Sequence, residues 1–126
     1  MTMDFRLNMS ERIARARGDL RMGVPIVLRL GDARALAMAV ETLTADRLTG
    51  LRAMGADPQV VITARRAETL KTAAYDGDLA RIALPKGVDL RWVRGISDPA
   101  HDLSTPMKGP LRSLRSGDVS AERLAL

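Results

Sequence analysis

A short apolar run directly after a helix-ending glycine limits the folds open to this chain. Gly23 and Pro25 separate a helical pattern from the sequence Ile-Val-Leu at residues 26–28. A run this short and rich in β-branched residues favours a strand, and its continuous apolarity is typical of a strand buried on both faces. We therefore expect Val24–Leu30 to form a strand that the following segments cover.

The residues before this strand have the pattern of an amphipathic helix. Ser10 is a suitable N-cap, and the charge of Glu11 suits the positive end of the helix dipole. Apolar residues recur at spacings of three and four at Ile13, Ala16 and Leu20. The pattern predicts a helix over Glu11–Met22 that ends at Gly23.

A second unit repeats the order of cap, helix and strand. Thr44 is an N-cap with Asp46 in the first turn, and Gly55 ends the helix. The clearest strand of the chain follows at residues 60–62, and Thr63 caps a further helix. Short turns between alternating strands and helices indicate an α/β fold class, with a small layered sheet and flanking helices.

Several segments carry weaker signals. The composition of Ala33–Leu43 favours a helix, whereas its short continuous apolar run also fits a strand. Tyr75–Asp78 is a turn, Leu79–Leu84 is a short apolar segment, and Leu90–Ile96 suggests a short helix or strand.

The chain divides into two parts at residue 96. Residues 1–96 are predicted to form the α/β domain, and residues 97–126 an irregular arm or linker that contains three X-Pro steps. Ser120 is again an N-cap, but the helix that it begins is far shorter than the roughly 12–15 residues that an isolated helix needs. We therefore expect the chain to be a fragment or the front of a longer protein.

Composition excludes several classes of function. The absence of cysteine excludes disulfides and thiolate zinc sites, and the single histidine excludes a multi-histidine metal site. No apolar run approaches the roughly 20 residues that cross a bilayer, and no signal segment is visible, so a cytoplasmic protein without a membrane partner is expected. The net charge is +5, but the arginines are interleaved with acidic residues rather than clustered, so nucleic acid is not an expected partner.

Three arginines are candidates for anion binding. Arg34 follows a turn after the first strand, and Arg65 and Arg66 follow Thr63 at a helix N-terminus, where free backbone N–H groups attract anions. A polar turn and a capped helix with solvated arginines explain the same residues. We name no catalytic residue and no metal ligand.

Carboxylates and the histidine have alternative interpretations. Asp32 can hold a metal-bound water, and Asp76 and Asp78 flank a glycine and can pair for acid–base or metal chemistry. His101 can act as a general base. A solvated turn or loop is the favoured explanation of each of these residues.

Segments in a shared order resemble a known enzyme family. Ala16–Leu28 resembles the opening helix and strand of 3,4-dihydroxy-2-butanone 4-phosphate synthases, and residues 36–63 are similar to their second strand, next helix and third strand. The likeness is closer to the degenerate synthase-like domain that precedes GTP cyclohydrolase II in some bacterial riboflavin enzymes. Three further segments resemble that domain: residues 63–71, 75–85 and 106–112. The resemblance implies that Ala35–Val40 is a strand and that the fold is a truncated synthase fold.

The departures from the family pattern decide the implied role. The synthases carry an acidic loop of the type D-x-x-x-R-E-N-E-G-D that holds magnesium, and here only Gly31–Arg34 stands in its place. The resemblance therefore implies an accessory, non-catalytic domain of a GTP cyclohydrolase II, with no cofactor of its own and with zinc in a downstream catalytic domain. It also implies a homodimer, because such synthases are dimers.

Two alternatives remain open. The first is a divergent magnesium-dependent synthase, which requires Asp32, Asp76 or Asp78 to converge in one cleft. The second is a module that binds phosphate compounds through Arg34, Arg65 and Arg66.

Overall fold

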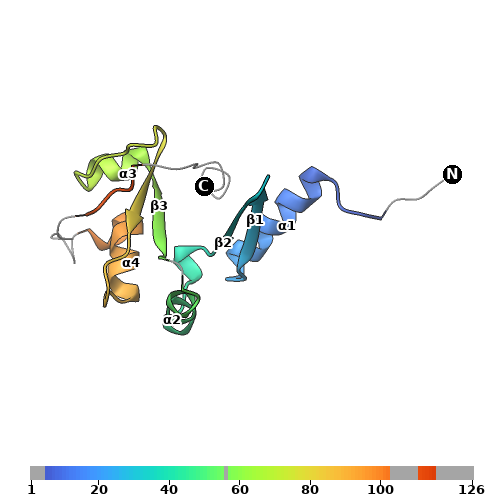
Figure 1. Cartoon of the computed structure of the whole chain (residues 1–126), viewed down its shortest axis with the longest axis horizontal. Helices are drawn as coiled ribbons and strands as arrows, with labels where there is room; N and C mark the ends of the chain where they lie inside the picture. Colours follow the sequence, from blue (N-terminus) through green and yellow to red (C-terminus); the bar gives the residue numbers. More distant parts are fainter. Residues whose placement is uncertain (1–4, 56, 103–110, 116–126) are drawn as a thin grey trace.

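The computed structural model describes residues 5–55, 57–102 and 111–115. It is a mixed α/β structure in which two small antiparallel sheets lie among helices (Figure 1). The elements, in chain order, are α1 (Met9–Arg21), β1 (Ile26–Leu30), β2 (Ala33–Ala37), the 3₁₀-helix η1 (Val40–Thr42), α2 (Ala45–Ala53), β3 (Gln59–Thr63), α3 (Ala64–Thr69), β4 (Leu79–Ala83), α4 (Leu90–Ser97) and the 3₁₀-helix η2 (Pro99–His101).

The described strands form two separate antiparallel pairs rather than one layered sheet. In the described residues, β1 pairs only with β2, and β3 pairs with β4, both in antiparallel order. The expected burial of the first strand on both faces is therefore wrong: Leu28 is buried, but Val27 on the opposite face is 68 % exposed. The apolar run predicts a strand but cannot show that β1 belongs to a two-stranded sheet with one open face.

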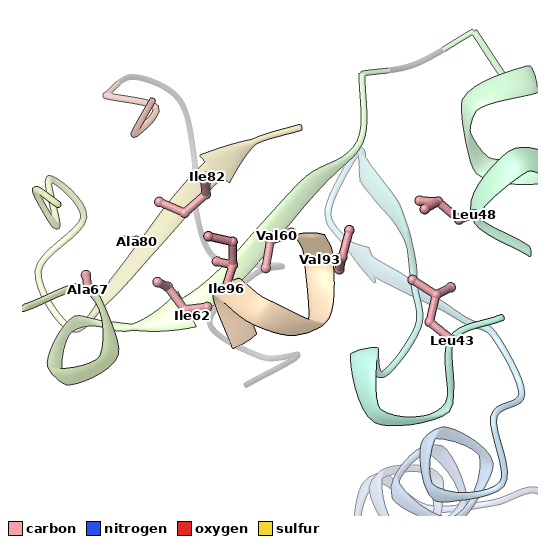
Figure 2. Close-up of a cluster of buried hydrophobic side chains, with 9 residues drawn as sticks. All are labelled: Leu43, Leu48, Val60, Ile62, Ala67, Ala80, Ile82, Val93 and Ile96. Carbon is pink, nitrogen blue, oxygen red and sulfur yellow. The ribbon is translucent and has the colours of Figure 1, made fainter. Parts of the chain in front are cut away.

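The main core lies around β3, β4 and α4 instead. Figure 2 shows Val60 and Ile62 of β3, Ile82 of β4 and Ile96 of α4 close to one another. Leu43 and Leu48 extend the cluster towards α2. By contrast, no side chain of α1 is buried, so the α1–β1–β2 end of the structure contributes little to this core.

Two of the three predicted N-caps that lie in the described residues begin helices. Thr44 accepts a hydrogen bond from the backbone N–H of Arg47, and Thr63 accepts one from the N–H of Arg66, as predicted. The predicted cap Ser10 is wrong, because α1 begins earlier: Asn8 and Glu11 exchange side-chain-to-backbone hydrogen bonds in a capping box.

The segments with ambiguous patterns have definite structures. Ala33–Ala37 is a strand, so the strand implied over Ala35–Val40 begins two residues earlier and ends three residues earlier, and Val40 belongs to η1. Residues 90–97 form a helix. Two contacts join the described residues of the predicted arm to the domain: Asp102, after η2, forms an ion pair with Arg66, and Ser113 forms a bridge with Ile82 of β4. The short helix expected from Ser120 lies outside the described residues.

Gly23 ends α1 as predicted, and its backbone explains why. Its φ is +83°, and a Cβ at this position would lie 3.2 Å from Cβ of Thr42. The hydroxyl of Thr42 donates to the carbonyl of Leu20, so this side chain is not free to move away. Glycine is therefore required here for both conformation and space.

Gly23→Ala is expected to destabilise the protein by about 1–2 kcal/mol, because a left-handed conformation costs that much in a residue with a Cβ. The measurement is the midpoint of urea unfolding. Gly18→Ala is the matched control: Gly18 lies inside α1 with nothing within 4 Å of its would-be Cβ, so this change should stabilise the protein by up to about 1 kcal/mol. Equal effects of the two substitutions would contradict the assignment.

Candidate functional site

The structure separates the three arginines that were predicted to bind an anion. Arg34 lies on β2 and Arg65 on α3, and both are exposed. Arg66, the next residue of α3, is only 8 % exposed. The helix places these neighbours on different faces, so Arg65 and Arg66 do not form one cationic site.

The guanidinium of Arg66 is occupied within the fold. It forms a two-pronged ion pair with Asp102, at 2.9 Å from Nη1 to Oδ2 and 2.8 Å from Nη2 to Oδ1. It also donates from Nε to the carbonyl of Ile96 and from Nη2 to that of Gly95, and these two carbonyls belong to the last turn of α4. Arg66 therefore joins α3, α4 and the segment after η2.

The charge state of Arg66 follows from these contacts. The hydrogen bond with Asp102 raises the pKa of Arg66 above its ordinary value, burial opposes this rise, and the charges of Asp102 and Asp98 add to it. The guanidinium consequently stays charged over the whole usual pH range. The guanidinium N–H groups donate to partners inside the fold, and these contacts do not favour a role in anion binding. That Arg66 binds an anion remains a prediction.

A second buried ion pair involves one of the candidate carboxylates. Nε of Arg81 lies 2.9 Å from Oδ2 of Asp76, and their side chains are 7 % and 6 % exposed. Asp76 thus binds an internal cation, whereas Asp78 is exposed on the same loop. Asp32 lies in the turn between β1 and β2, in the other sheet. The convergence that the synthase alternative requires is not seen among these three carboxylates.

A groove of about 920 Å³ lies between the two sheets. One wall runs along β2 from Arg34 and continues to η1, and the other wall runs along β3. Aliphatic side chains of α2 and α4 complete the lining, including Leu48, Leu51 and Val93. Both the size and the apolar lining are typical of ligand-binding pockets in proteins.

Charged and polar residues also line the groove, among them Glu41, Asp57 and Ser97. The hydroxyl of Ser97, at the end of α4, is buried and has no hydrogen-bond partner within the described part of the chain. A buried hydroxyl normally has a partner. The Ser97 hydroxyl is therefore an exception among the buried side-chain polar groups of the described residues.

The described residues contain no group of three or more acidic or histidine side chains placed to hold a metal ion. The side chain of His101 lies outside what the structure describes. Within the same described ranges, no helix combines the length and the apolar character that crossing a bilayer demands.

Sequence reasoning missed the groove and both buried ion pairs. Arg66 and Asp102 are 36 positions apart, and no local pattern links them. Asp76 and Arg81 are five apart on a loop and a strand, which is not a recognisable helical spacing. The only available signal was that Arg81 stands inside an apolar segment, where a charged residue calls for a partner.

In comparisons with known proteins, no family model, no curated protein and no solved structure matches this chain.

Proposed function

We propose that this chain is an accessory, non-catalytic domain of a cytoplasmic GTP cyclohydrolase II of riboflavin biosynthesis, and that it supports the catalytic domain or its dimerisation. The support is the resemblance of its segments to the degenerate synthase-like domain. The observation that carries the proposal is that two candidate functional residues form ion pairs inside the fold. Asp76 binds Arg81, and Arg66 binds Asp102.

The divergent synthase is the less favoured candidate. It needs magnesium held by carboxylates in one cleft, and Asp76 is buried against Arg81 while Asp32 lies in the other sheet. The phosphate-binding module is likewise less favoured, since Arg65 and Arg66 lie on different faces of α3.

The accessory role is tested with the purified chain and a purified bacterial GTP cyclohydrolase II catalytic domain. We expect no conversion of ribulose 5-phosphate in the presence of magnesium, and we expect sedimentation equilibrium to give a dimer of twice 13.7 kDa or a complex with the catalytic domain. Turnover of ribulose 5-phosphate would refute the proposal. So would a chain that stays monomeric and forms no complex.

A further inference from the structure

Among the described residues, β2 forms one wall of the groove with a strand edge that no other strand pairs. β1 and β2 are joined by the two-residue turn Gly31–Asp32, so Leu30 and Ala33 form the hydrogen-bonded pair that closes the hairpin. Hydrogen-bonded and non-hydrogen-bonded pairs alternate in an antiparallel ladder. Arg34 and Leu36 therefore direct their N–H and C=O groups away from β1, and no other strand among the described residues pairs with β2.

The opposite wall of the groove, formed by β3, is also the edge of a two-stranded sheet. Ala83 donates to the carbonyl of Arg112, and Leu114 donates to the carbonyl of Arg81, so these β4 residues bond away from β3. Val61 lies opposite Arg81 and consequently directs its own N–H and C=O groups away from β4. The groove thus lies between two strand edges, and unpaired edges are templates for the addition of another strand.

The charges along β2 indicate what kind of strand fits. Arg29 and Arg34 are directly opposite each other in a non-hydrogen-bonded pair, where side chains are closest, and both are exposed. Neither has a carboxylate partner in the described part of the chain. Like charges in directly opposed positions destabilise a hairpin, and an anionic neighbour relieves that repulsion.

The same open face carries an apolar pair. Val27 and Leu36 are opposite each other, at 68 % and 39 % exposure. On the other face of the hairpin, Ala35 and Ala37 line the groove together with aliphatic residues of α2. An added strand next to β2 therefore meets arginine on one face and mainly aliphatic side chains on the other, because successive residues point to opposite faces. The lining of the groove also contains two carboxylates, Glu41 and Asp57.

We propose that this groove binds an extended, acidic segment of a partner protein with aliphatic residues at alternate positions, which adds as a strand to the free edge of β2. Backbone hydrogen bonds to Arg34 and Leu36 supply the pairing, and carboxylates beside Arg34 and Arg29 supply the selectivity. A second copy of this chain complements the edge less well, since it carries the same arginine pair and a net charge of +5. The inference does not depend on the proposed function.

The test uses two synthetic peptides, acetylated and amidated, with alternating glutamate and valine (EVEVEVE) or lysine and valine (KVKVKVK). Calorimetry should show saturable binding of the glutamate peptide and at least tenfold weaker binding of the lysine peptide. Equal binding of both peptides, or binding of neither, would overturn the proposal.

Three variants locate the binding. Leu36→Pro removes an N–H that points out of the hairpin, and it should reduce the affinity for the glutamate peptide at least tenfold. Arg34→Glu should reduce that affinity at least tenfold and raise the affinity for the lysine peptide. Arg65→Glu makes the same charge change on exposed α3 and should alter either affinity less than twofold.

Folding and self-association are controlled separately. Circular dichroism shows whether Leu36→Pro keeps the fold, and if it does not, Arg34→Glu alone decides the question. Sedimentation equilibrium then shows whether a second copy occupies the edge. A wild-type oligomer that Leu36→Pro converts to monomer would overturn the proposal in favour of self-pairing, whereas the dimer of the proposed function should survive this substitution.

Discussion

Asp76→Asn should cost about 3–5 kcal/mol of unfolding free energy, the largest effect that we expect from a single neutralised charge in this chain. The substitution keeps the volume of the side chain but leaves the guanidinium of Arg81 charged and deeply buried. A small domain has only about 5–15 kcal/mol of stability in total. Urea unfolding, followed by circular dichroism at the helix band, measures the loss.

The control for this substitution is Glu68→Gln. Glu68 is exposed on α3, so neutralising its charge should change the stability by no more than about 0.5 kcal/mol. The double variant Asp76→Leu with Arg81→Met removes both charges and should recover most of the loss. A cost below about 1 kcal/mol for Asp76→Asn would show that this pair does not stabilise the fold.

Arg66→Met should cost about 3 kcal/mol, less than the loss at Asp76, because its partner Asp102 is 33 % exposed and can be hydrated. The methionine fills much of the space, but it leaves the carbonyls of Gly95 and Ile96 without their side-chain donor. Thermal unfolding of the wild type and of the Arg66→Met variant measures the difference in stability. Arg65→Met, on the exposed face of the same helix, is the control and should be nearly neutral.

Two further observations would separate charge from geometry at Arg66. Arg66→Lys keeps the charge but not the planar fork that reaches Asp102 and two carbonyls, so it should recover less than half of the lost stability.

The pKa of Arg66 is raised in the folded state, so its stabilising effect is present at every pH below the ordinary value for arginine and is lost only as the pH rises through the raised value. A wild-type advantage over Arg66→Met that disappears between pH 7 and pH 9 would contradict this.

The sequence was informative wherever a short segment decides its own structure. Thr44 and Thr63 begin helices because their hydroxyls bond to N–H groups three residues ahead, and Gly23 ends a helix through its own φ. Ser10 failed as a cap because Asn8, two residues earlier, has the same ability and the better-placed partner Glu11.

Features that depend on distant residues escaped prediction. The exposure of Val27 depends on which elements cover β1, and nothing within the apolar run carries that information. The position of the core in β3, β4 and α4, and the groove between β2 and β3, likewise result from packing between segments that are far apart in sequence. The charged candidates Arg66 and Asp76 looked like surface groups because their partners could not be recognised from spacing.

The absence of buried side chains in α1 has a consequence for how the two ends of the molecule move. Free energies of local opening follow the number of buried apolar contacts, so the α1–β1–β2 end opens at a lower free energy than the β3–β4–α4 core. A strand added at β2 would be lost in each such opening, and its binding therefore slows amide exchange in the hairpin while exchange in the core stays unchanged. Occupancy of the groove and order of the amino-terminal end are thus thermodynamically linked.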